Sequence, residues 1–282
     1  MKNDTIFALA SGGGKAGIAV YRISGPRACE VLDATAGLAP PPPRQARRIE
    51  LRDPESGELI DDGLILWFPA PASYTGENVL EIQVHGGRGT HAALSRALSR
   101  MIRMAEPGEF TRRAFENGKL DLTQAEGLAD LIEAETAAQH RQAQRQLAGS
   151  LGALYEQWRK KLIDARAMLE AEIDFSDEDL PAGLADRVGR EIEDLTREIA
   201  QHLDDGGRGE SVRDGFQIAV IGPPNAGKSS LVNALARRDV AITAESPGTT
   251  RDVVEVRLDI RGHAVTLCDT AGLIEAGGEA GG

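Results

Sequence analysis

The octapeptide at residues 222–229, GPPNAGKS, constrains this chain more than any other feature. It fits the phosphate-binding pattern G-x-x-x-x-G-K-[ST] and follows the apolar run Phe216–Ile221, which is typical of a strand. Glycines let the backbone curl so that successive N–H groups point at phosphate oxygens, and the helix expected from Lys228 adds the positive end of its dipole. The Lys228 ammonium is expected to reach the β- and γ-phosphates, and the Ser229 hydroxyl to bind Mg²⁺. The segment therefore predicts a nucleotide phosphate site.

Two downstream segments narrow the class of nucleotide-binding protein. Residues 247–252 read PGTTRD, and residues 269–272 read DTAG directly after the strand-like run at 264–268. An acid that ends a strand beside a phosphate loop suits a Mg²⁺-linked carboxylate, and Gly272 permits close approach to the γ-phosphate. A threonine in the polar loop upstream of Asp269 can complete the metal shell and lose that contact after hydrolysis, which makes a switch. In this order the segments predict a GTPase of the Ras-like superclass.

The nucleotide-binding segment is short for such a domain. A complete G domain runs to about 160 residues, and residues 216–282 hold neither the later strands nor an N-K-x-D segment that reads guanine. Guanine specificity therefore cannot be inferred from these residues. A sheet that stops after its third strand leaves apolar surface uncovered. We therefore expect low or absent GTP hydrolysis by this chain.

Composition indicates a multidomain protein of a reducing compartment. The 282 residues suggest two or three domains, and 41% hydrophobic residues with only 4% aromatic ones predict aliphatic cores. Two cysteines, Cys29 and Cys268, make no disulfide framework. No signal peptide or membrane-spanning run is apparent, so we expect a cytoplasmic protein without membrane contact.

The net charge of −12 argues against a basic nucleic-acid-binding domain. Any RNA contact must then use a local patch or the surface of a partner protein. Two arginine groups could supply patches, although solvated surface arginines explain them more simply: Arg44, Arg47 and Arg48, and Arg96, Arg100 and Arg103.

The pattern along the chain predicts a multidomain α/β plus α fold in three parts. Residues 1–118 read as an α+β domain, with strands expected at 5–10, 17–23, 64–68 and 79–84 and helices at 26–36 and 90–104. Residues 119–212 have the three- and four-residue apolar spacing of a helical bundle, and residues 213–282 form the partial P-loop α/β domain. The acidic segment 173–181 reads as a solvated turn or, less simply, a metal site, and 206–209 reads as a flexible link.

Several further segments carry a family resemblance over residues 4–275. These segments are DTI at 4–6, RISG at 22–25, YTGE at 74–77, HGG at 85–87, PGEFT at 107–111, AF at 114–115, KLDLTQAE at 119–126, DLI at 130–132 and PNAGKSS at 224–230. With them, the chain resembles the N-terminal portion of the MnmE (TrmE) family of tRNA-modification GTPases. Residues 107–126 discriminate best, because other P-loop GTPases have nothing similar.

The resemblance implies an N-terminal folate-binding-like domain that forms a homodimer. It would hold 5-formyltetrahydrofolate as a one-carbon source, with family positions falling on Arg22, Glu81 and Lys119. Arg22 and Lys119 can meet carboxylates, and Glu81 can accept from the N–H groups of a pterin. Without the family, Glu81 is the polar side of an alternating strand and Lys119 is a cation at a helix start.

The resemblance also implies the nucleotide and metal ligands. K⁺ would stand where other GTPases place an arginine finger, held by Asn225, Ala244, Ser246 and Thr249; Ser229 and Thr250 would bind Mg²⁺. The implied GTP-binding set is Asn225, Ala226, Gly227, Lys228, Ser229, Ser230, Ala244, Glu245, Ser246, Pro247, Gly248, Thr249, Thr250, Asp269, Thr270, Ala271 and Gly272. The implied partners are a flavin-dependent MnmG-type protein and tRNA, whose wobble uridine would gain a carboxymethylaminomethyl or aminomethyl group.

Three departures leave two main hypotheses open. Ser11–Lys15 replaces a proline-rich loop, the family's water-placing glutamate falls on Gly281 with Glu279 out of register, and the C-terminal cysteine motif is absent. No catalytic residue is therefore assigned. The chain is either a tRNA-modification GTPase or a folate-binding dimerisation module with an inactive nucleotide-binding stub. A ribosome-assembly GTPase is disfavoured by residues 1–120.

Overall fold

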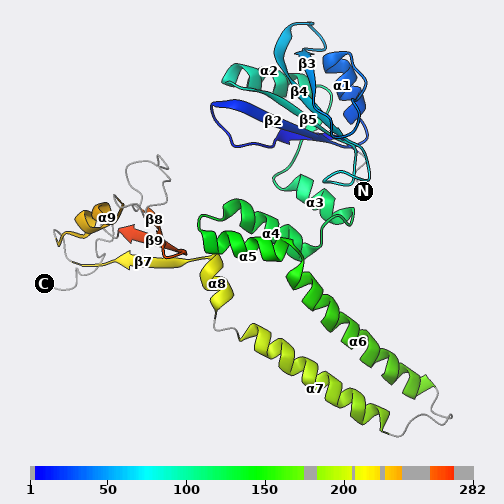
Figure 1. Cartoon of the computed structure of the whole chain (residues 1–282), viewed down its shortest axis with the longest axis vertical. Coiled ribbons are helices and arrows are strands. Elements are labelled where there is room, and N and C mark those ends of the chain that lie inside the picture. The colour runs from blue at the N-terminus through cyan, green and yellow to red at the C-terminus, as the bar shows by residue number, and fades with distance from the viewer. Residues whose placement is uncertain (1–3, 175–182, 205–206, 223–225, 237–254, 270–282) are drawn as a thin grey trace, which may run out of the picture. The chain divides into compact units, whose positions relative to one another are not determined.

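The computed structural model describes residues 4–174, 183–204, 207–222, 226–236 and 255–269. The chain divides into two compact units, residues 1–125 and 126–282. Both α+β and all-helical regions are present, as expected from the sequence (Figure 1).

The first unit is built on a six-stranded sheet in the order β3-β4-β5-β2-β1-β6. Neighbouring strands run antiparallel, except that β1 and β6 are parallel. The elements of this unit are β1 (Ile6–Leu9), β2 (Ala16–Ser24), α1 (Ala28–Ala36), β3 (Arg47–Arg52), β4 (Leu59–Phe68), β5 (Val79–Gly86), α2 (Arg88–Ser99), β6 (Arg103–Met104) and α3 (Glu109–Glu116).

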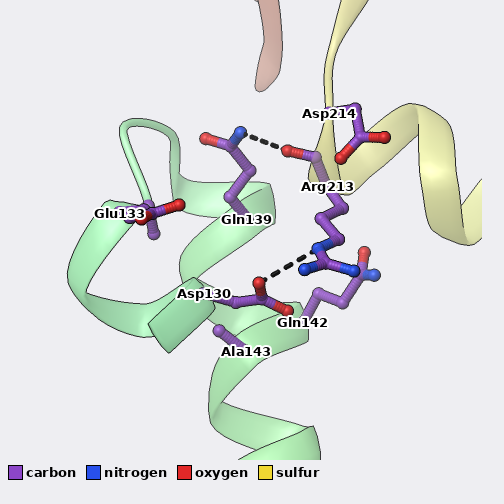
Figure 2. Close-up of a pocket in the computed structure, with 8 residues that line it drawn as sticks. Asp130, Glu133, Gln139, Gln142, Ala143, Arg213 and Asp214 are labelled. Carbon is purple, nitrogen blue, oxygen red and sulfur yellow. Dashed lines mark hydrogen bonds and ion pairs between the residues drawn. The ribbon is translucent and has the colours of Figure 1, made fainter. Parts of the chain in front are cut away.

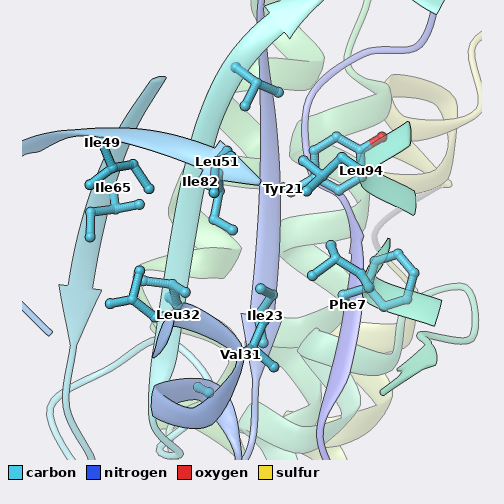
Figure 3. Close-up of a cluster of buried hydrophobic side chains, with 14 of the residues drawn as sticks. Phe7, Tyr21, Ile23, Val31, Leu32, Ile49, Leu51, Ile65, Ile82 and Leu94 are labelled. Atoms are coloured by element: carbon cyan, nitrogen blue, oxygen red, sulfur yellow. The ribbon is translucent and has the colours of Figure 1, made fainter. Parts of the chain in front are cut away.

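Alternation along the central strands decides which face of this sheet forms the core. Tyr21 and Ile23 of β2 and Ile82 of β5 are buried with side chains of α1 and α2, including Leu32 and Leu94 (Figure 3). Burial of each such aliphatic side chain contributes about 1.5–3 kcal/mol. Because side chains alternate along a strand, the residues between them point to the other face. This places polar side chains of β2 and β5 outside the core.

Two expectations for this unit were wrong. The helix predicted for 90–104 ends at Ser99, and Arg103–Met104 forms β6 beside β1. The apolar spacing over residues 90–104 placed Ile102 in the core, and Ile102 is buried there although it is not part of a helix. The strand β3 was not anticipated, because its sequence RRIELR carries charges on the exposed side of an edge strand.

The second unit begins with helices. Four of them are α5 (Ala137–Leu147), α6 (Ser150–Asp174), α7 (Leu184–Leu203) and α8 (Arg208–Arg213), while α4 (Leu122–Glu133) crosses the boundary between the units. The α5 helix starts with a capping box. The Thr136 hydroxyl accepts from the Gln139 N–H, and the Gln139 side-chain oxygen accepts from the Thr136 N–H. The long helices α6 and α7 pack side by side (Figure 1).

Parts of the expected helical region differ from the prediction or lie outside the described residues. The acidic segment predicted as a turn falls mostly outside them, at 175–181, and α6 extends to Asp174. Of the predicted flexible link, Gly206 lies outside them, whereas Arg208 begins α8. Among the described residues, no helix combines the length and hydrophobicity needed to cross a bilayer.

A second, three-stranded sheet follows these helices, in the order β7-β9-β8. Its elements are β7 (Phe216–Val220), α9 (Lys228–Ala236), β8 (Glu255–Ile260) and β9 (His263–Asp269). β7 and β9 are parallel, and β8 and β9 are antiparallel. Its buried cluster consists of Leu258, Val265 and Leu267, while Phe216 and Ile218 of β7 are exposed. Much apolar surface of β7 is therefore uncovered within the described residues.

Candidate functional sites

Arg22 and Glu81 face each other on the sheet surface opposite the core. They are direct cross-strand neighbours of β2 and β5, where alternation places them between the core residues. The Arg22 Nε and Nη2 groups donate to Glu81 Oε1 at 3.0 and 2.8 Å. The Arg22 side chain is 27% exposed and that of Glu81 is 19% exposed, so a ligand can still reach the pair. The structure thus brings two of the three implied folate ligands into contact.

Two aromatic rings lie against the Arg22 guanidinium. Its Cζ atom is 5.1 Å from the centroid of the Tyr74 ring and 5.7 Å from that of Phe110. These distances lie within the range of cation–π attraction. No local sequence pattern indicates this contact, because Tyr74 and Phe110 were only parts of motifs that carry the resemblance. The fold brings them to Arg22 from the β4–β5 loop and from α3.

Lys119 lies against the same loop that carries Tyr74. Its Nζ donates to the carbonyl oxygen of Pro71 at 3.1 Å. Gly76 has φ +80°, which disfavours any side chain, and a Cβ atom there would lie only 3.0 Å from Asn117 Cβ, so glycine suits the close approach of the loop to residues 117–119. All three implied folate ligands therefore lie in the first unit, with Arg22 and Lys119 both in contact with the β4–β5 loop.

A buried ion-pair network lies beside this region and consists of Asp4, Glu77, Arg103, Glu109 and Arg113. The Glu109 side chain is 1% exposed and accepts from Arg103 Nη1 and Nη2 at 2.8 and 2.5 Å and from Arg113 Nη2 at 2.9 Å. Arg113 also reaches Asp4 at 2.8 Å and Glu77 at 3.1 Å. Four of the segments that carry the family resemblance meet in this network. Asp4 belongs to DTI, Glu77 to YTGE and Glu109 to PGEFT, and Ser24 of RISG donates to Glu77 at 2.7 Å. The network gives DTI and PGEFT a structural role.

The electrostatics of this network favour the charged forms of Glu109 and Asp4. Hydrogen bonds from Arg103 are the main cause that holds the pKa of Glu109 far below its usual range. Burial raises the pKa of Asp4, but hydrogen bonds from Arg103 and Arg113 outweigh that effect and lower it. A cavity of about 610 Å³ adjoins the network and is lined by Glu77, Glu106, Glu109, Arg112, Arg113, Glu116 and Asn117.

A strand and a helix flank the segment 222–229 in the order that the sequence predicts, and residues 223–225 lie outside the described residues. Gly222 follows β7, and α9 begins at Lys228, whose Nζ donates to the Gly222 carbonyl oxygen at 2.9 Å. Asp269 is the register partner of Val220, at the carboxyl ends of two parallel strands. The backbone therefore brings Asp269 to the sheet edge from which the phosphate loop begins.

Most other implied nucleotide and metal ligands lie outside the described residues. These are Asn225, Ala244, Glu245, Ser246, Pro247, Gly248, Thr249, Thr250, Thr270, Ala271 and Gly272, together with Glu279 and Gly281. Ala226, Gly227, Ser229 and Ser230 have a described backbone next to Lys228. In the described part of the chain, no cluster of three or more His, Cys, Asp or Glu residues suits a metal ion.

Hydrogen bonds connect α4 and α5 to Arg213, the last residue of α8 before β7. The Gln139 Nε2 group donates to the Arg213 carbonyl oxygen at 2.9 Å, and Arg213 Nε donates to Asp130 at 3.0 Å (Figure 2). These contacts border a pocket of about 130 Å³. Because Gln139 also completes the α5 capping box, one side chain joins the start of α5 to the chain just before β7.

The two arginine groups considered for RNA contact are mostly paired. Arg48 pairs with Asp62, and Arg100 pairs with Asp53 and Glu55. Arg44 donates to the Ala72 carbonyl oxygen, and Arg103 belongs to the buried network. Neither group forms a free basic patch within the described residues.

Comparison with known proteins decides the family. Residues 5–119 match a family described as GTP-binding protein TrmE N-terminus, and residues 122–274 match one described as MnmE helical domain. The chain belongs to the MnmE (TrmE) family. The N-terminal α+β part and the helical part expected from the resemblance are therefore confirmed as MnmE regions.

Curated MnmE relatives are similar along nearly the whole chain. The protein named tRNA modification GTPase MnmE from Parvibaculum lavamentivorans is 59% identical over 277 residues, covering 98% of this chain and 63% of the relative. The proteins of that name from Paramagnetospirillum magneticum and Rhodospirillum rubrum are 56% and 54% identical, covering 96% and 98% of this chain and 62% and 63% of the relatives. The chain thus spans less than two thirds of the length of these MnmE proteins.

Proposed function

We propose that this chain is the folate-binding and nucleotide-binding portion of a GTPase that modifies the wobble uridine of tRNA. It would bind 5-formyltetrahydrofolate through Arg22, Glu81 and Lys119, and GTP through the loop that ends at Lys228. The observation that carries the proposal is the joint presence of the Arg22–Glu81 pair and the β7–loop–α9 arrangement in one MnmE-family chain.

The folate half of the proposal is supported by the chemistry of the paired residues. Arg22 uses Nε and Nη2 on one oxygen of Glu81, so its Nη1 remains to donate and Glu81 Oε2 remains to accept. A pteridine ring offers both an acceptor and N–H donors along one edge. Lys119 is an exposed cation that suits a carboxylate or carbonyl oxygen of the same ligand.

Isothermal titration with 5-formyltetrahydrofolate tests the folate half. The 282-residue chain is expected to bind, and Arg22→Ala is expected to weaken binding about thirtyfold, because a charged hydrogen bond contributes about 1.5–3 kcal/mol. Arg52→Ala is the matched control, since Arg52 pairs with Glu50 on the edge strand β3. Unchanged affinity in Arg22→Ala would remove Arg22 from the site.

The nucleotide half of the proposal requires metal ligands in addition to Lys228 and Asp269. Ser229 and Thr250 are proposed to bind Mg²⁺, which neutralises phosphate charge when bound, and Asn225 with Ala244, Ser246 and Thr249 to bind K⁺. Hydrolysis by this chain is proposed to be low, because the described sheet buries few side chains and leaves β7 exposed. A folate-binding module with an inactive nucleotide stub is the alternative that this exposure favours.

The remaining features of the proposal concern partners and location. We expect a homodimer that acts in the cytoplasm with a flavin-dependent MnmG-type partner and tRNA. Relatives covering nearly all of this chain carry the name tRNA modification GTPase, which supports tRNA as the substrate.

A further inference from the structure

We infer that Tyr74 is a positioning residue of the folate site, whose ring holds the Arg22 guanidinium in place beside Glu81. The inference rests on the proposed folate function. Neither the family match nor the implied ligand set gives Tyr74 a role. Its 5.1 Å distance to Arg22 Cζ is the observation that carries the inference.

Two hydrogen bonds to other segments restrain Tyr74 and the residue that follows it. Its hydroxyl is 2.9 Å from the Thr111 hydroxyl of α3, in a hydrogen bond. The following residue, Thr75, accepts through its carbonyl oxygen from Asn117 Nδ2 at 2.7 Å. An aromatic ring anchored at its polar end has little freedom to move, so it can hold a neighbouring cation at a defined place.

Arg22 needs such a support because Glu81 restrains only one edge of it. Both donors that it gives to Glu81 go to the same oxygen, Oε1. Hydrogen bonds to one atom leave the guanidinium free to pivot about that atom. Contact with the Tyr74 ring, and with Phe110 at 5.7 Å, restricts this pivot. Nη1 of Arg22 and Oε2 of Glu81, which have no hydrogen-bond partner among the described residues, then face a ligand as a fixed donor and acceptor.

A double-mutant cycle separates positioning from a direct or merely structural role. Titration of the 282-residue chain with 5-formyltetrahydrofolate is expected to show about tenfold weaker binding in Tyr74→Leu, which is the size of a partly desolvated cation–π contact. Tyr74→Phe keeps the ring but loses its hydrogen bond to Thr111, so its affinity is expected to fall between those of the parent chain and Tyr74→Leu. In the Arg22→Ala background, Tyr74→Leu is expected to change the affinity no further. Additive losses in the double variant would overturn the inference.

A spectroscopic measurement covers the case in which the parent chain binds no folate. Absence of folate binding by the parent chain would reject the folate proposal but would not test the position of Tyr74. The NMR resonance of Arg22 Nε–H, identified by its loss in Arg22→Lys, still reports whether the Tyr74 ring lies beside Arg22. Tyr74→Leu is expected to remove the ring-current shift of this resonance, and Tyr74→Phe to retain it. Tyr155→Leu, at an exposed tyrosine of α6, is the matched control and should leave it unchanged. An Arg22 resonance unaffected by Tyr74→Leu would overturn the positioning role.

Discussion

Glu109→Gln is expected to lower the melting temperature of the first unit by about 10 °C. Glu109 is 1% exposed and accepts from both Arg103 and Arg113, so the amide would remove the buried negative charge that these two guanidinium groups share and leave them with Asp4 and Glu77. Removing one member of a buried ion pair costs about 3 kcal/mol, and a domain of this size loses a few degrees for each kcal/mol. Differential scanning calorimetry of the full chain measures the change.

Glu106→Gln is the matched control for this substitution. Glu106 pairs with Arg112 in the same segment, but its side chain is 53% exposed, and exposed pairs contribute little. A melting temperature that falls equally in both variants would contradict the special role of Glu109.

The effect of Glu109 is expected to depend on pH in a defined direction. Its pKa is lowered in the folded state, mainly by Arg103, so its contribution is complete above the unfolded pKa of about 4.3 and is lost as the pH falls towards the folded value. The difference in unfolding free energy between the parent chain and Glu109→Gln should therefore narrow as the pH drops below about 4. A difference that widens with acid would contradict this assignment.

Lys228→Ala is expected to weaken Mg²⁺–GTP binding about a hundredfold, because charged hydrogen bonds of about 1.5–3 kcal/mol to the phosphates would be lost. Lys228 Nζ donates to the Gly222 carbonyl oxygen at 2.9 Å, so its ammonium lies beside the first residue of the proposed phosphate-binding segment. Titration with a fluorescent GTP analogue in K⁺ buffer measures the affinity. Lys160→Ala on α6 is the matched control, because Lys160 is exposed and distant in sequence from the loop.

Turnover in the same samples tests the expectation of low hydrolysis. GTP hydrolysis that rises when Na⁺ is replaced by K⁺, and that disappears in Lys228→Ala, would contradict low activity of this chain. Equal nucleotide affinity in the parent chain and Lys228→Ala would contradict the phosphate site itself.

Sequence reasoning succeeded where the signal was local. The apolar run before Gly222 predicted the strand β7, and the residues from Lys228 predicted the helix α9. The run before Asp269 likewise predicted β9, and parallel pairing brings its end beside Val220. Such features depend on a few neighbouring residues, so the sequence carries them directly.

Sequence reasoning failed where a distant segment decided the outcome. The apolar stripe through Met101 and Ile102 fits a helix, but pairing with β1 turns Arg103–Met104 into a strand. Arg103 was considered as part of a surface patch, yet it is bound to Asp4, 99 positions away. Neither partner can be found from the local pattern.

The amino-acid pattern by itself determined the strand before Gly222 and the helix from Lys228, an aliphatic α+β region and a helical region, because apolar periodicity and glycine placement act over a few residues. Only the tertiary structure decided which charges meet. Arg22 and Glu81 are 59 positions apart, and Arg113 and Asp4 are 109 apart. Their pairing depends on strand register and on packing of α3, which are set by contacts along the whole first unit. The folate proposal and the stability of the Glu109 network both depend on that long-range placement.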